Sequence, residues 1–196
     1  MTIKIRSNVF ETNSSSVHTI VFHPTDMANV VCTDIMKIEG GQYGRCPKHP
    51  LETIEERLNY LWTAIWDTYI ETFNFETQKY ESNWDELNWW KDAIHLYCPN
   101  AILYSLVVDE GEWDFPYVDH VGLLKPLLDA MKKDISLLKY YLLDPQGYII
   151  VSGDEAYEEE EREYFNPDLI PHISWEDAEK VIFNEKEQEY VYVKGN

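Results

Sequence analysis

The stretch FETNSSSVH, residues 10–18, gathers side chains whose types and spacing could do chemistry. Hydroxyl and amide side chains bond nearby backbone in turns, and such loops can point successive N–H groups at an anion. A serine near a histidine also suggests a nucleophile and its base, and Ser16 and His18 would face the same side of an extended strand. The alternative is a tight hairpin turn whose polar groups satisfy one another. The residues concerned are Glu11, Thr12, Asn13, Ser14, Ser15, Ser16 and His18.

A second group of polar residues lies in VDH, 118–120, and SGDE, 152–155. Asp119 could orient His120 or His18, or it could join Asp154 as a ligand for a hard metal ion. If this group shared a pocket with FETNSSSVH, the chain would be a small nucleotide or phosphoester hydrolase. Its catalytic residues would then be Ser14, Ser16, His18, Asp119 and His120, with a histidine moving the proton. The alternative, surface acids in an acid-rich protein, is favoured for this second group.

The motif CPKH, residues 46–49, places Cys46 and His49 at a spacing that could hold zinc together with Cys32. A structural zinc site needs four ligands, and only Cys98 or a distant histidine could complete it. No metal or cofactor is therefore assigned. Three cysteines at irregular spacing do not form a disulfide framework, and no apolar run approaches the length of a membrane span. We expect a cytoplasmic protein of a bacterial cell that has no membrane partner.

The charge of the chain is −20 and is unevenly distributed. Residues 1–50 carry a net +1, and residues 51–196 carry −21. Such a surface repels nucleic-acid phosphates, and it speeds encounter with basic proteins, including those that bind nucleic acid. The simpler interpretation is that the charge only keeps the protein soluble. Seven Trp and fourteen Tyr must either fill a core or face a partner.

Hydrophobic periodicity predicts an α+β fold, a single domain over 1–196 with a mixed or antiparallel sheet of about five strands and a central cluster of helices. Ser82 with Asp85 resembles a capping box, Pro126 suits a first helical turn, and Asp134 could cap the next helix. Residues 39–50 are predicted to be an exposed loop, and 154–163 an acidic solvated segment. Helices are expected over 52–73, 83–97, 123–133, 135–143 and 175–183, and strands over 3–10, 18–23, 101–108, 147–153 and 189–193.

The opening KIRSNVFETNSSSVHTI resembles the start of a group of bacteriophage and prophage proteins that have no assigned activity. The later DHVG and YYLLDPQGYIIVSGDE are similar to the second half of that group. In similar proteins Gln-Ser often follows the Asp-His pair, where this chain has Val121 and Gly122. The resemblance implies a phage or mobile-element origin and a shared role for Glu11 to His18, either structural or functional.

Size, charge, aromatic content and this resemblance together favour a phage-type acidic binding protein. Its partner would be a basic host protein that handles nucleic acid or takes part in defence, inhibited as anti-CRISPR or DNA-mimic proteins inhibit theirs. The hydrolase described above and an accessory protein without a catalytic role are the alternatives. The binding candidates are Glu11, Thr12, Asn13 and Ser15 in the polar motif, and Trp84, Trp89, Trp90 and Trp113 beside Asp85, Glu86, Glu110, Glu112 and Asp114.

Overall fold

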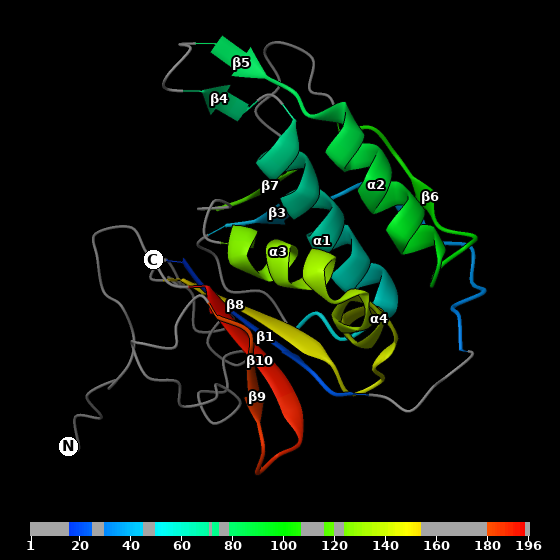
Figure 1. Cartoon of the computed structure of the whole chain (residues 1–196), viewed down its shortest axis with the longest axis vertical. Coiled ribbons are helices and arrows are strands. Elements are labelled where there is room, and N and C mark those ends of the chain that lie inside the picture. Colours follow the sequence, from blue (N-terminus) through cyan, green and yellow to red (C-terminus); the bar gives the residue numbers. More distant parts are fainter. Residues whose placement is uncertain are drawn as a thin grey trace, which may run out of the picture.

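The structure is a computed structural model of the whole chain, and it confirms the α+β class (Figure 1). In the part of the chain that the structure describes, four helices pack with a four-stranded antiparallel sheet and three small two-stranded ladders to form one body. The residues that the structure describes are 16–24, 30–44, 50–70, 72–74, 79–106, 116–119, 124–153 and 180–194. The predicted strand over 3–10 and the acidic segment 154–163 lie outside them.

The main sheet has the strand order β8-β1-β10-β9, and all its pairings are antiparallel. Strand β1 occupies an inner position, so both of its edges are hydrogen-bonded. His18 lies opposite Val151 on one side and Lys194 on the other. The strands are β1 (Ser16–Phe22), β8 (Tyr148–Gly153), β9 (Ile182–Asn184) and β10 (Glu189–Lys194).

Strand alternation divides β1 between two faces of the sheet. His18, Ile20 and Phe22 share one face, and Ile20 and Phe22 belong to the main hydrophobic core with the helices. Thr19 and Val21 share the other face, where Val21 packs with Val191 and Val193. Side chains of both faces are buried, which explains why the strand reads as nearly continuous apolar sequence.

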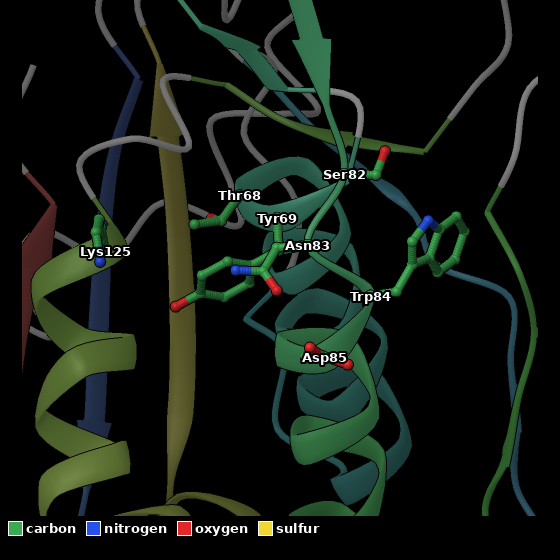
Figure 2. A pocket seen from close by; sticks show the side chains of 7 residues that line it. All are labelled: Thr68, Tyr69, Ser82, Asn83, Trp84, Asp85 and Lys125. Carbon is green, nitrogen blue, oxygen red and sulfur yellow. The ribbon is translucent and has the colours of Figure 1, made fainter.

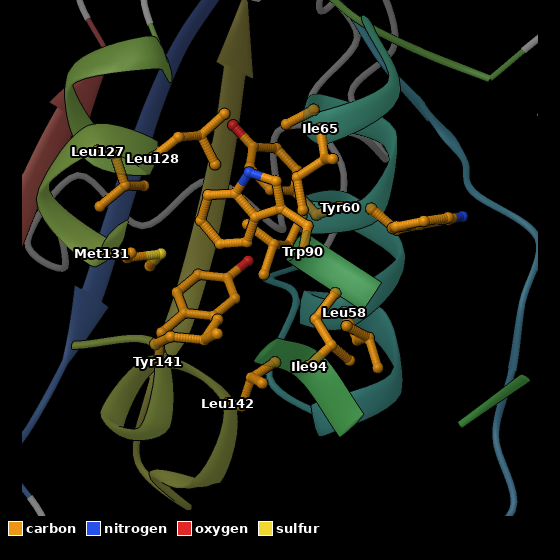
Figure 3. Packing of buried hydrophobic residues seen from close by; sticks show 14 of the residues in the cluster. Leu58, Tyr60, Ile65, Trp90, Ile94, Leu127, Leu128, Met131, Tyr141 and Leu142 are labelled. Carbon is orange, nitrogen blue, oxygen red and sulfur yellow. The ribbon is translucent and has the colours of Figure 1, made fainter. Parts of the chain in front are cut away.

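The helices are α1 (Ile54–Tyr69), α2 (Trp84–His95), α3 (Lys125–Lys133) and α4 (Ile135–Leu143). Helix α1 is central: it contacts α2 on one side and α4 on the other, and α4 in turn contacts β1. Side chains from α1, α2, α3 and α4 meet in the core, where Trp90 of α2 lies between Ile65 of α1 and Leu128 of α3 (Figure 3). Among the described residues, no helix is both long and apolar enough to cross a membrane.

Three short two-stranded ladders pack against α1. The first is parallel and joins β2 (Lys37–Ile38) to β6 (Ile102–Leu103). The second is also parallel and joins β3 (Gln42–Tyr43) to β7 (Tyr117–Val118). The third is antiparallel and joins β4 (Thr72–Asn74) to β5 (Lys79–Glu81). Helix α1 contacts β2, β7 and β4, so it connects the ladders to the main sheet.

The helix caps confirm one prediction and correct another. Asp134 accepts a hydrogen bond from the Ser136 amide at 3.0 Å, as expected of the cap of α4. The cap of α2 is Asn83, which accepts from Glu86 N at 3.2 Å; the predicted Ser82–Asp85 box is wrong by one residue. A full capping box, which the sequence analysis overlooked, begins α1 at Thr53 and Glu56.

Three predicted elements differ in the structure. Within residues 101–106, the described part of the strand expected over 101–108, the strand is Ile102–Leu103, which pairs with the two-residue β2. The helix expected over 175–183 is wrong at its end, where 182–184 form β9, a strand whose partner is β10. The exposed loop predicted over 39–50 is wrong at Tyr43, which is 5% exposed because β3 pairs with β7 beneath α1.

The guanidinium of Arg57 joins the first turn of α1 to the end of α4. Arg57 is 1% exposed, and its Nη1 donates to Tyr141 O at 2.8 Å while its Nη2 donates to Asp144 O at 2.6 Å. Tyr141 returns a bond, since its hydroxyl donates to Arg57 O at 2.7 Å. The last carbonyls of a helix have no partner within it, so the cation satisfies them and complements the helix dipole. A β-carbon at Gly147 would collide with Arg57 Nη1.

Replacement of Arg57 by methionine should lower the free energy of unfolding by roughly 3 kcal/mol, because it leaves buried carbonyls of α4 without donors. Lys125→Met is the matched control, since the Lys125–Asp129 pair is half exposed and should be worth less than about 0.5 kcal/mol. Urea unfolding of both variants measures the difference. Equal losses would show that Arg57 does not hold α4.

Candidate functional site

The polar motif enters the described residues only at its end. Glu11, Thr12, Asn13, Ser14 and Ser15 lie outside them, while Ser16 begins β1. His18 is fully buried, and its Nδ1 lies 2.7 Å from the hydroxyl of Tyr60 on α1. The two rings meet edge to face with centroids 5.6 Å apart. His18 therefore ties the central strand to the central helix.

A second tyrosine connects this pair to Asp119. The rings of Tyr60 and Tyr43 are 4.9 Å apart, and Tyr43 O accepts the amide of Asp119 at 2.9 Å. The predicted site residues His18 and Asp119 are thus linked through the two tyrosines, with Asp119 joined through its backbone, while His120 and Asp154 lie outside the described residues. Burial raises the pKa of both tyrosines well above the ordinary value. Their hydroxyls stay protonated at neutral pH and act as hydrogen-bonding groups rather than bases.

A histidine that the sequence analysis did not select lies between two carboxylates. His23 Nδ1 is 2.8 Å from Asp144 Oδ2, and His23 Nε2 is 3.5 Å from Glu189 Oε2. The backbone amide of His23 also donates to Asp144, at 2.7 Å. Because both ring nitrogens face carboxylates, this imidazole joins the ends of β1, α4 and β10. No spacing rule links residues 121 positions apart, so sequence reasoning had no signal for it.

Asp67 on α1 is a buried acid that the sequence analysis also missed. Its Oδ2 accepts the amide of Val118 at 2.7 Å, which fixes β7 against the helix. Burial raises the pKa of Asp67 from 3.8 to about 6, although the bond from Val118 opposes the shift. The native protein therefore pays a desolvation cost for ionised Asp67 at neutral pH.

The cysteines give the zinc prediction no geometric support in the described part of the chain. Cys32 and Cys98 are buried and free, whereas Cys46 and His49 lie outside the described residues. Burial raises the pKa of the Cys98 thiol to about 12, and the neighbouring Cys32 makes a smaller contribution in the same direction. The thiol therefore stays protonated at neutral pH. Within the ranges described above, no group of three or more His, Cys, Asp or Glu side chains could hold a metal ion.

Two of the predicted tryptophan anchors are exposed on α2, and one is not. Trp84 is 53% exposed and Trp89 is 36% exposed. Trp90 is fully buried, so its selection as an anchor is wrong. Trp90 lies on the buried face of α2 together with Leu87 and Ile94, at helical spacing. Trp89, one residue earlier, lies on a different side of the helix. Trp113, Glu110, Glu112 and Asp114 lie outside the described residues.

The exposed tryptophans are held in place by their neighbours. The Trp84 ring meets the buried Trp66 ring edge to face with centroids 6.0 Å apart. Lys132 of α3 lies 5.3 Å from the centre of the Trp89 ring and 2.5 Å from a carboxylate oxygen of Glu86. We call the exposed side of this helix the α2 outer face, and define it by Trp84, Asp85, Asn88, Trp89 and Asp92.

An open cleft of about 680 Å³ lies beside the beginning of the α2 outer face (Figure 2). Charged groups of both signs line it, so it has no clear preference for an anion or a cation. Trp84 lies on the side remote from Lys125, and Tyr69 lies between them. The lining residues are Thr68, Tyr69, Ser82, Asn83, Trp84, Asp85 and Lys125.

Removal of the hydroxyl from the His18–Tyr60 pair should destabilise the fold. Tyr60→Phe leaves a buried imidazole nitrogen without that partner, and we expect a loss of about 1–3 kcal/mol in the free energy of unfolding. Tyr104→Phe, at a side chain that is 40% exposed, is the matched control and should change little. Chemical denaturation compares them, and an unaffected Tyr60→Phe protein would contradict a structural role for His18.

Asp67→Asn should stabilise the protein at neutral pH and flatten its pH dependence. The raised pKa means that the contribution of Asp67 to stability is full below about pH 4 and is lost as the pH rises through about 6. Asparagine can still accept the Val118 amide but never ionises. Melting temperatures between pH 4 and pH 8 test this, and parallel curves for wild type and variant would refute it.

Three comparisons address the relatives of the chain. No protein-family model, no curated protein sequence and no solved structure matches it. The resemblance of the opening motif to phage and prophage proteins therefore stays a prediction.

Proposed function

We propose that the protein is an acidic inhibitor, which binds a basic, nucleic-acid-handling protein of a bacterial host. The observation that carries the proposal is the pair of exposed tryptophans on the α2 outer face, Trp84 and Trp89, beside the exposed carboxylates of Asp85 and Asp92. Large aromatic side chains dominate binding energy at interfaces, and a surrounding field of one sign steers the encounter.

The rigidity of this face supports the proposal. Trp84 rests on Trp66, and Trp89 is fixed by Lys132, so neither ring needs to lose much freedom on binding. The net charge of −21 over residues 51–196 would draw a basic surface toward the face and would repel free nucleic acid.

The burial of His18 favours binding over the hydrolase alternative. An acid or base must come within hydrogen-bonding reach of its substrate. His18 is 0% exposed and engages Tyr60, so its described contacts serve the fold. Loss of catalytic function is therefore not the effect we expect from changes at β1.

The test is capture from a bacterial lysate with tagged protein, washed at low and at high salt. We expect wild type to retain a basic nucleic-acid-handling protein at low salt and to release it at high salt, because charge steers the complex. The Trp84→Ala/Trp89→Ala double variant should bind the captured protein at least about tenfold more weakly.

Phe183→Ala is the matched control, since Phe183 is 38% exposed on β9, away from α2. Melting curves of all three proteins establish that they are folded. A complex that resists salt would contradict charge steering, and equal binding by wild type and the double variant would remove the α2 outer face from the interface.

A further inference from the structure

Exposed apolar side chains gather beside β6, separately from the two tryptophans. Ile35 is 75% exposed and Leu96 is 62% exposed, which are high values for large aliphatic residues. Ile102 of β6 and Tyr104, the residue that follows β6, are 43% and 40% exposed. We call these four residues the β6 strip.

The members of the β6 strip come from three segments that hydrogen bonds hold together. Cys32 N donates to Tyr97 O at 2.7 Å, which joins the segment before β2 to the end of α2. His95 Nε2 lies 3.0 Å from Ala101 O, which joins α2 to the start of β6. Figure 1 shows α2, β6 and the segment before β2 along one side of the molecule. The strip is therefore one surface on a firm backbone.

One edge of β6 carries backbone groups that the ladder with β2 does not use. The amides of Ile102 and Tyr104 donate to Met36 O at 2.8 Å and to Ile38 O at 3.0 Å. Alternate residues of a strand direct their polar groups to opposite edges, so the N–H and C=O of Leu103 face away from β2. Within the described ranges, no backbone hydrogen bond engages Leu103 at this edge. Such an edge is a template for another strand.

The charges around the strip select the kind of strand that would fit. Asp34, Glu39 and Asp92 are exposed on the segments that border it, against the single exposed cation Lys37 among the described residues there. Each copy of the chain carries −20, so a second copy would be repelled. A segment with apolar side chains on one face and lysine or arginine on the other would meet both the strip and the carboxylates.

We propose that the partner adds an extended segment of alternating apolar and basic residues to the free edge of β6. Its backbone bonds Leu103, and its apolar side chains cover Leu96, Ile102 and Tyr104, while Ile35 lies on the β2 side, beyond the reach of a strand added at this edge. This inference rests on the proposed function, because it specifies how the basic partner is held. The tryptophans of the α2 outer face then contact a neighbouring part of the same partner.

The probe is a synthetic peptide of about eight residues that alternates lysine and valine, a common strand length. Residue-resolved amide hydrogen exchange of the full chain is the measurement. We expect saturating peptide to slow exchange at Leu103 by at least about tenfold, while Ile102 and Tyr104, which already bond to the β2 side, change little. A peptide with glutamate in place of lysine, and one with a central proline, should leave Leu103 unprotected.

The variant pair Ile102→Lys and Leu96→Lys tests the apolar contact. Ile102 is 43% exposed and Leu96 is 62% exposed, so the changes should leave the melting temperature nearly unaltered, and peptide affinity should fall at least about tenfold. Phe183→Lys adds the same charge away from the strip and is the matched control. Equal weakening by all three would mean that added charge alone accounts for the loss, and it would overturn the inference.

The outcomes separate this inference from the proposed function. Unchanged exchange at Leu103 with saturating peptide overturns strand addition, while tryptophan-dependent capture of a basic host protein would still support the proposed function. Protection of Leu103 that rises with protein concentration and needs no peptide would assign the edge to a second copy instead. If neither the peptide nor any basic protein binds, both proposals fail.

Discussion

The buried guanidinium of Arg57 is the constraint on which the rest of the fold depends. It lies in the first turn of the central helix, and it satisfies the carbonyls at the end of α4. These carbonyls lie in the last turn of α4 and at its C-cap, just before the chain turns into β8, so one cation fixes the end of α4 against α1. A buried charge is tolerated only when it is fully hydrogen-bonded, which makes this joint sensitive to displacement.

Strand β1 extends the same polar network to both of its ends. His18 meets Tyr60 near one end, and His23 meets Asp144 just beyond the other. Asp144 in turn offers its backbone oxygen to Arg57. The buried polar groups thus fix the positions of α1, α4 and β1 relative to one another. The apolar core around Trp90 and Tyr141 contains most of the buried side chains. The exposed surfaces on α2 and β6 are attached to this body and are free to serve contacts outside it.

Local patterns predicted the elements that carry their own signal. The helix over 135–143 and the strands over 147–153 and 189–193 were found because periodicity and flanking glycines are local properties. The burial of Trp90 beside an exposed Trp89 depends on which stripe of α2 faces α1, and the spacing to Leu87 and Ile94 contained that information. The contacts of Arg57 with the end of α4 and of His23 with Asp144 and Glu189 join positions 84 to 166 residues apart, and no local pattern encodes them.

The pairing of β1 with β10 has a consequence for synthesis. These neighbours in the sheet are separated by more than 160 residues of chain, and the other neighbour of β1, β8, also comes late. A ribosome emits β1 long before either partner exists, so the sheet closes only after translation has passed residue 194. Both edges of β1 stay open until β8 is made, and the edge that pairs with β10 stays open until the end, which makes the nascent chain a natural client for chaperones.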